Sequence, residues 1–391
     1  MRKSFFLAFA VLILWAPVAA SAFEFVPMVF PSARLDALGG EHAALADDIS
    51  VLLSNPAAYR SAPPQFSVAE LTANLNGPIF SLADMVFRLT GGTSGTSLLT
   101  DPNIQKLLTS LHTGATINGP ISLGYIGNGL GFGLFNATTA TFSTEGTVPT
   151  VNSEIREDLM FVAGYSFRIP IPDGWHSTLD AGFSIKTFSR VGIDWSESIL
   201  SFFSLITSPS ASTLYNQPMD IYVGFGLDAG ALYNWNSTVS VGLVARNLYS
   251  PVQQTHWATV NDFSAGVAGT KSYGAVPLDL SLGVVYTPQW AFLSDYFSSP
   301  KFMLDYSDIF DFWTHPDSAS NPILHVGLGM EVTLLDILAM RVGFGDGYFS
   351  AGVGIDLAVM QFGLTMYGQE LSSQPGLRPN YNLLLSSVFR F

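Results

Sequence analysis

Short segments in which apolar and polar residues alternate recur from residue 65 to the end of the chain. In the clearest one, residues 324–334, every even position is Leu, Val or Met, and the odd positions hold His325, two glycines, Glu331 and Thr333. Successive side chains of a β-strand point to opposite faces. This period of two therefore predicts a strand with one apolar and one polar face.

We predict fourteen such strands. They span residues 65–75, 117–126, 130–140, 158–168, 178–190, 220–233, 237–248, 278–287, 301–310, 323–334, 338–345, 349–358, 361–369 and 382–391. Many approach the roughly 9–11 residues with which a tilted strand crosses a bilayer. A soluble sandwich could produce one such strand, but an array with charges on one face favours an all-β, fourteen-stranded antiparallel transmembrane barrel.

The connections between these strands differ in length on the two sides of the predicted barrel. If the first strand rises from the periplasm, the extracellular connections are 76–116, 141–157, 191–219, 249–277, 311–322, 346–348 and 370–381, all but one of them long. The periplasmic connections are mostly tight, as at Asn128-Gly129, a strong hairpin signal. Long loops on one side and short turns on the other are typical of outer-membrane barrels. The turns near 169–177 and 288–300 are longer, which leaves room for a strand count two higher or lower.

Both termini indicate export to the bacterial outer membrane. Arg2 and Lys3 precede an apolar run and a small-residue stretch ending at Ala22, so we expect residues 1–22 to be a signal peptide. The last predicted strand ends on Phe389 and Phe391. A terminal aromatic resembles the signal recognised by the machinery that assembles outer-membrane barrels, which we therefore expect as a partner.

Composition narrows the class of protein. The net charge is −14, only 12% of residues are charged, 13% are aromatic, and there are 36 glycines and no cysteine. Such a charge excludes a nucleic-acid partner, and the lack of cysteine excludes disulfides and thiolate chemistry. A barrel that faces lipid outside and water inside combines this apolar, aromatic and glycine-rich composition.

Glycines gather on the predicted inner face of the barrel. They are Gly131, Gly133, Gly224, Gly226, Gly242, Gly327, Gly329, Gly352 and Gly354. Glycine weakens a strand, so an inward-facing series indicates that something approaches the wall closely, or that the sheet bends there. The expected occupant is the N-terminal segment, residues 23–64, which shows no strand pattern and precedes the barrel of residues 65–391.

This N-terminal segment carries a family resemblance in its residues 33–40, 43–48 and 54–57. They resemble the hatch, or plug, of the FadL-type long-chain fatty acid transporters and their PorV-like relatives. The resemblance assigns the hatch motif to Gly39, Gly40, Asp47, Asp48, Asn55, Pro56 and Ala57. Many members have glycine where this chain has Ala58. Taken without the family, the glycines form a turn, the aspartates a solvated or capping pair, and Asn55-Pro56 a turn initiator.

The resemblance implies passive uptake of hydrophobic molecules such as long-chain fatty acids. In the family, the ligand is caught in an extracellular apolar groove, enters the lumen and leaves sideways through a gap in the wall. Candidate capture residues are Ile104, Leu107, Leu108 and Leu111 in the first outer connection, and Phe202 and Phe203 in the third. Exposed apolar patches commonly mark binding sites, and capture of a lipid-like ligand would explain these. The alternatives are that these loops pack on each other or bind another protein.

For a ligand carboxylate, the candidate partners are the inner-face cations Lys186, Arg246, Arg341 and Arg390. Inner-face acids offer a structural alternative, which we favour for any single cation. These acids are Asp180, Asp228, Asp279, Asp305, Glu331 and Asp356.

Enzymatic function finds little support in the sequence. The six histidines are scattered, and neither a His-Glu-x-x-His motif nor a Gly-x-Ser-x-Gly elbow is present. We expect no enzyme activity, no cofactor and no metal. The predicted protein is a monomeric, plugged transporter in the lipid bilayer. The alternative is a PorV-like or adhesin-type binding or assembly protein without transport, and a general diffusion porin comes third.

Overall fold

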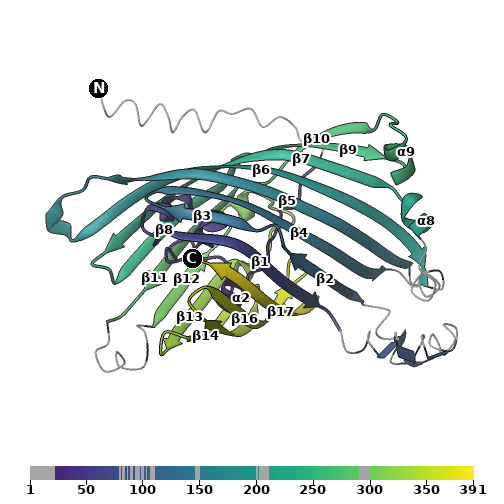
Figure 1. Cartoon of the computed structure of the whole chain (residues 1–391). Coiled ribbons are helices and arrows are strands. Elements are labelled where there is room, and N and C mark those ends of the chain that lie inside the picture. Colours follow the sequence, from purple (N-terminus) through teal and green to yellow (C-terminus); the bar gives the residue numbers. More distant parts are fainter. Residues whose placement is uncertain are drawn as a thin grey trace.

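The structure is a computed structural model, and it shows a closed β-barrel (Figure 1). It describes residues 23–391 apart from 79–80, 82–83, 86, 89–90, 93–96, 98–100, 103, 106–110, 146–149, 200, 202–210, 290–296 and 298–299. The predicted signal peptide lies outside the described residues. Every neighbouring pair of strands in the described sheet is antiparallel, and the first strand pairs with the last to close it.

The described residues form 17 strand segments in one sheet. They are β1 (Gln65–Asn76), β2 (His112–Asn118), β3 (Leu123–Gly127), β4 (Leu130–Glu145), β5 (Thr150–Ile169), β6 (Ser177–Ser198), β7 (Met219–Trp235), β8 (Val239–Tyr249), β9 (Pro251–Trp257), β10 (Thr270–Ala275), β11 (Asp279–Tyr286), β12 (Lys301–Tyr306), β13 (Val326–Leu334), β14 (Leu338–Gly345), β15 (Tyr348–Asp356), β16 (Met360–Glu370) and β17 (Pro379–Arg390).

Three interruptions divide single strands into two segments each. β2 and β3 both pair with β1 and β4, and β8 and β9 both pair with β7. On the next strand, β10 pairs with β9 and β11 pairs with β8. With each interrupted strand counted once, the 17 segments make fourteen strands, which confirms the predicted barrel.

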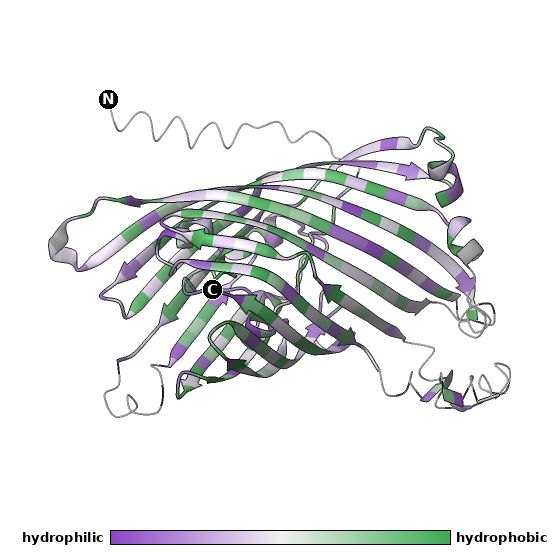
Figure 2. Ribbon diagram, in the orientation of Figure 1, coloured by the Kyte–Doolittle hydropathy of each residue, from purple (hydrophilic) through white to green (hydrophobic). Residues whose placement is uncertain are grey.

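The strands are longer at the end of the barrel with the long connections than the sequence pattern predicts. The predicted connection 141–157 is mostly the continuation of β4 and β5, and 249–277 contains β9 and β10. These extensions carry polar residues such as Thr141, Ser143 and Glu154 on paired positions. Because a strand beyond the membrane meets water on both faces, apolar alternation does not mark it. Figure 2 shows hydrophobic and hydrophilic residues alternating along many of the strands.

The predicted tight turns are present. Asn128 and Gly129 join β3 to β4 with φ of 53° and 88°, and Leu335 and Asp336 between β13 and β14 have φ of 52° and 58°. Two consecutive residues with positive φ are typical of a type I′ hairpin, whose twist matches that of the strands. The short turns therefore follow from local sequence, although Leu335 is an unusual residue for this conformation.

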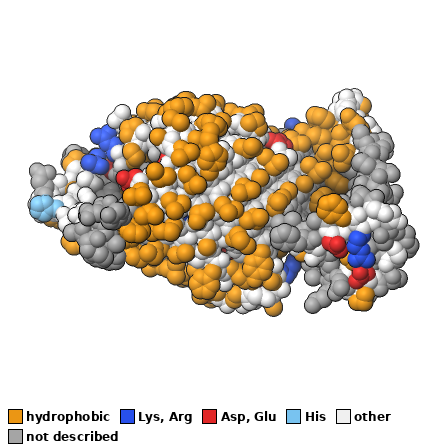
Figure 3. All heavy atoms as spheres, turned by 60° about the horizontal axis from the view of Figure 1, so that its bottom comes forward, with side chains coloured by type: hydrophobic (Ala, Val, Ile, Leu, Met, Phe, Trp, Pro, Cys, Tyr) orange, Lys and Arg blue, Asp and Glu red, His pale blue; other side chains and the backbone are white. Residues whose placement is uncertain are grey.

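The outer surface of the barrel is apolar. On β5 and β6, Leu159, Phe161, Phe183 and Ile185 point outward, and each is 40–51% exposed. Hydrophobic side chains cover much of the face drawn in Figure 3. Such a band suits contact with lipid acyl chains. None of the described helices has the length and apolar character needed to cross a bilayer.

The N-terminal segment lies inside the barrel. Its helix α2 (Ala33–Ala37) contacts the part of the barrel wall formed by β14–β17. The helix η1 (Pro56–Arg60) contacts a different part of the wall, formed by β3–β7. A short helix α3 (Val51–Ser54) lies between them in the sequence and contacts η1, β4 and β5. Ala37, Leu38 and Tyr59 are fully buried.

The remaining short helices belong to connections between strands. They are η2 (Asp173–Trp175), α8 (Ala211–Tyr215), α9 (Val260–Ser264), α10 (Asp311–Thr314) and η4 (Pro322–His325).

Six of the nine predicted inner-face glycines lie against the N-terminal segment. They are Gly131, Gly133, Gly242, Gly327, Gly329 and Gly352. A Cβ on Gly329 would lie 2.7 Å from the carbonyl oxygen of Leu38, and one on Gly242 would meet the backbone of Ala43. The other three, Gly224, Gly226 and Gly354, face side chains of the wall itself. The close approach inferred from the sequence therefore applies to most of these positions.

Candidate ligand cavity inside the barrel

The Asn55-Pro56-Ala57 motif anchors the N-terminal segment to the wall. The Asn55 side chain accepts a hydrogen bond from Ala57 N at 3.0 Å, and its Nδ2 donates to Ala43 O at 2.6 Å and Ala231 O at 3.4 Å. Asn55 thus caps η1, in which Pro56 takes the first position, and also bonds to β7. Its buried amide is satisfied within the barrel.

Gly39 and Gly40 form the turn after α2. Their φ angles are 87° and 120°, a region that side-chain-bearing residues rarely adopt. A Cβ on Gly39 would also meet the backbone of Phe344 and Leu328. Close approach and backbone conformation together require glycine at position 39.

Asp47 and Asp48 bind a partly buried arginine from the same segment. Arg34 donates to Asp47 Oδ1 at 2.7 Å and to Asp48 Oδ2 at 2.6 Å, and it also bonds to Glu331 of β13. Lys301 of β12 pairs with Asp47 at 2.5 Å. This group, here called the Arg34 cluster, links the segment to the wall by ionic contacts.

A cavity of about 750 Å³ lies between the N-terminal segment and the wall. One part is apolar and is lined by Phe25, Met28, Phe30, Phe135, Met160 and Phe188. The rings of Phe25 and Phe188 stack with centroids 5.6 Å apart. The other part is lined by the Arg34 cluster and further charged residues of the wall.

The lining of this cavity includes residues near both ends of the barrel. Ser307 and Asp308 follow β12 at the end with the long connections, whereas Gln65 and Asp336 lie at the end with the short turns. Burial, followed by the nearby carboxylates of Asp279 and Asp311, raises the pKa of Asp308. The cavity thus extends along the barrel past the N-terminal segment.

All four candidate cations line this cavity, and each pairs with an acid that the sequence analysis named. The pairs are Lys186–Asp228 at 2.9 Å, Arg246–Asp279 at 2.6 Å, Arg341–Glu331 at 2.6 Å and Arg390–Asp356 at 2.5 Å. Arg246 also bonds to Glu41 of the N-terminal segment at 2.8 Å. These pairings agree with the expectation that inner-face acids, rather than a ligand, pair with each of these cations.

The predicted capture residues are only partly described. Ile104 and Leu111 are buried, with exposed fractions of 4% and 3%, which fits loops that pack on each other. Leu107, Leu108, Phe202 and Phe203 lie outside the described residues.

Sequence reasoning missed an exposed aromatic group at α10. Phe312 and Trp313 are each 69% exposed, and both the Phe310–Trp313 and Phe312–Trp313 ring pairs are in contact, with centroids 5.9 and 6.3 Å apart. The signal was the aromatic run at 310–313, which the strand pattern divided between a strand and a connection.

The predicted assembly residues lie at the seam of the barrel. The backbone of Phe391 forms two hydrogen bonds of 2.8 Å with that of Phe66 on β1. The side chains of Phe389 and Phe391 are exposed on the outer surface.

A second cavity, of about 500 Å³, is lined by outward-facing apolar residues of β1 and β15–β17, including Leu71, Val353 and Leu385. It shares Ile355, Phe362, Gly363 and Ser386 with the inner cavity. The wall formed by β15–β17 therefore separates the two spaces by a single layer of residues.

No family model and no curated protein match the chain. Among solved structures it is similar to the CymD monoaromatic hydrocarbon channel, with 12% identity, coverage of 90% of this chain and 95% of that one, and a TM-score of 0.45. A Pseudomonas aeruginosa FadL homologue shares 13% identity, with coverage of 94% and 99% and a TM-score of 0.44. The Pseudomonas putida toluene transporter TodX shares 12%, with coverage of 95% and 99% and a TM-score of 0.43.

Proposed function

We propose that this protein is a FadL-type passive transporter of hydrophobic small molecules in the bacterial outer membrane. The observation that carries the proposal is the cavity of about 750 Å³, whose apolar part opens between the N-terminal segment and the wall. Ligand pockets commonly measure about 300–1,000 Å³ and combine apolar walls with a few polar groups. In this proposal residues 23–64 act as the plug, and the exported barrel works as a monomer.

Long-chain fatty acids are the ligand class that we propose, because the cavity has an apolar part and a charged part whose lining includes lysine and arginine side chains. Among the four paired cations, Arg246 is the best candidate for the ligand carboxylate. Its partner Glu41 has a side chain that is 44% exposed, so a ligand can replace it without burying a new unpaired charge. A guanidinium also suits a carboxylate geometrically.

The thin wall at β15–β17 supports a sideways exit into the membrane. Ile355, Phe362, Gly363 and Ser386 border both the inner and the outer cavity. A hydrophobic ligand that leaves there passes directly into lipid, where its transfer from water is favourable. Small movements of α2, which contacts β15–β17, would change the thickness of this barrier.

Uptake of radiolabelled oleate and toluene by cells that express the full chain tests this proposal. Met160→Trp places a larger side chain in the apolar part of the cavity, and Leu159→Trp is its matched control because Leu159 faces outward on the same strand, 40% exposed. We expect wild type and the control to raise uptake above that of cells without the protein. Met160→Trp should return uptake close to that background.

The same purified proteins should bind oleate in detergent, with weaker binding for Met160→Trp. Equal uptake by cells with and without the wild-type protein would contradict transport. Binding without uptake would favour the alternative, a binding or assembly protein. The exposed Phe312 and Trp313 are the observation that supports this alternative, since exposed aromatic groups also form protein interfaces.

A further inference from the structure

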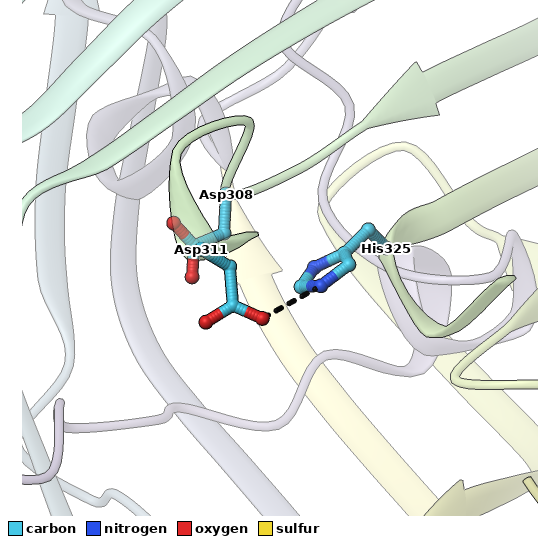
Figure 4. Close-up of side chains that lie close together, drawn as sticks. All are labelled: Asp308, Asp311 and His325. Atoms are coloured by element: carbon cyan, nitrogen blue, oxygen red, sulfur yellow. Dashed lines mark hydrogen bonds and ion pairs between the residues drawn. The ribbon is translucent and has the colours of Figure 1, made fainter. Parts of the chain in front are cut away.

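The outer connection between β12 and β13 brings together two carboxylates and an imidazole that come from different parts of that connection. Asp308 follows β12, Asp311 opens α10, and His325 ends η4. Figure 4 shows the side chains of these three residues close together, with a bond between Asp311 and His325. Their metal-binding atoms all lie within 4.8 Å of one another.

The individual contacts hold Asp311 in a fixed position. Its Oδ2 bonds to His325 Nε2 at 3.1 Å and accepts from Ser320 N at 2.7 Å, while its Oδ1 lies 3.2 Å from His315 Nδ1. Within the described part of the chain, the Asp308 carboxylate takes part in no hydrogen bond or ion pair. The cluster therefore includes one carboxylate without a partner next to a carboxylate–imidazole pair.

Two carboxylates and an imidazole are a donor set that suits zinc and similar divalent transition metals. Zinc binds these oxygen and nitrogen atoms at about 2.0–2.2 Å, so its ligand atoms lie somewhat closer together than the upper bound found here. Small side-chain rotations would close the set. An ion would also neutralise the unpaired charge of Asp308.

We propose that Asp308, Asp311 and His325 bind one divalent transition-metal ion of the zinc class, with water in the fourth position. His315 holds Asp311 in place through its other carboxylate oxygen, as partners of metal ligands commonly do. This proposal does not depend on the proposed transport function, and it can be tested without measuring transport.

The ion would connect three elements at the extracellular end of the cavity. Asp308 lines that cavity, Asp311 belongs to α10 with its exposed Phe312 and Trp313, and His325 leads into β13. His315 Nε2 also lies 3.4 Å from Glu24 of the N-terminal segment. A bound ion would fix the aromatic group of α10 next to the cavity.

Titration of the purified full chain with Co²⁺ in detergent, after treatment with a chelator and without a polyhistidine tag, tests this site. We expect saturable visible absorption at one ion per chain, displaced by Zn²⁺. Asp308→Asn and His325→Gln, which are close in shape to the native residues, should each weaken Co²⁺ binding at least tenfold. His256→Gln is the control, because His256 also pairs with an aspartate, Asp220 at 3.0 Å, outside the proposed site.

Heat-modifiable migration in gels verifies that each variant remains a folded barrel. No saturable absorption in the wild type would overturn the proposal and leave His325 and Asp311 as a simple ion pair. Co²⁺ binding that neither Asp308→Asn nor His325→Gln weakens would place the ion elsewhere and overturn it equally. Binding lost in the His256→Gln control would have the same consequence.

Discussion

Arg34 of α2 donates two parallel hydrogen bonds to Glu331 of β13, from Nε to Oε2 at 2.9 Å and from Nη2 to Oε1 at 2.6 Å. Arginine–carboxylate pairs with this geometry are among the stronger hydrogen-bonded contacts in proteins. Arg341 donates to the same carboxylate at 2.6 Å. The contact joins residues that are far apart in the chain, and it attaches the N-terminal segment to the barrel wall.

We expect Arg34→Gln to destabilise the protein by about 1–3 kcal/mol, because Asp48 loses its ion-pair partner while Asp47 keeps Lys301 and Glu331 keeps Arg341. Urea unfolding in lipid vesicles measures this loss. Arg60→Gln, a change of an exposed arginine in the same segment, is the control and should alter the free energy of unfolding by less than about 0.5 kcal/mol. Unfolding of both variants at the same urea concentration would show that the Arg34 cluster contributes nothing to stability.

Gly242→Ala tests how closely the N-terminal segment approaches the wall. A Cβ there would meet the backbone of Ala43, which cannot move aside as a flexible side chain could. We expect a loss of about 1–3 kcal/mol and faster proteolysis within residues 23–64. Gly192→Ala on β6 is the control, since a Cβ at Gly192 meets no atom within 4 Å. A Gly242 variant as stable and as resistant to protease as this control would contradict the close contact.

The exposed aromatic group of α10 should help to capture hydrophobic ligands if the protein transports them. We expect the double change Phe312→Ser and Trp313→Ser to reduce oleate uptake severalfold at low ligand concentration and little at saturation. Trp175→Ser removes a similarly exposed aromatic ring, 59% exposed, from the periplasmic side and should leave uptake unchanged. Identical uptake curves for the double variant and the wild type would assign α10 another role.

Phe391→Ala should impair assembly in cells without impairing the fold. The backbone bonds between Phe391 and Phe66 do not need the side chain, so refolding in detergent should proceed as in the wild type. We expect less folded protein in the outer-membrane fraction of cells. The control is Leu385→Ala, which removes an outward-facing side chain of the same strand, 55% exposed. Equal amounts of both variants in that fraction would argue against an assembly signal at Phe391.

The sequence predicted the strands well where one face meets lipid and the other meets the lumen. The segment Leu338–Gly345 is β14 with the same bounds in sequence and structure. The predicted strand began too late on β5, which begins at Thr150 rather than near residue 158. Outside the membrane both faces of a strand are wet, so the alternation that marks its course disappears.

Side-chain partners were harder to predict than strands. The sequence named Asp47, Asp48 and Glu331 without joining them to Arg34, and it treated His315 and His325 as scattered. The structure brings the first group together in the lumen and the second around Asp311. Hairpin turns are local, but these contacts depend on where the N-terminal segment and the outer connection fold.

By itself, the sequence predicted an antiparallel barrel of about fourteen strands and which face of each strand is apolar. It could do so because a period of two and a tight turn are properties of neighbouring residues. Only the tertiary structure decided which inner charges pair, where the cavity lies and which groups meet at its outer end. Closure of the barrel around residues 23–64 brings groups such as Arg34 and Glu331 into contact. No local sequence pattern predicts a contact between residues so far apart in the chain.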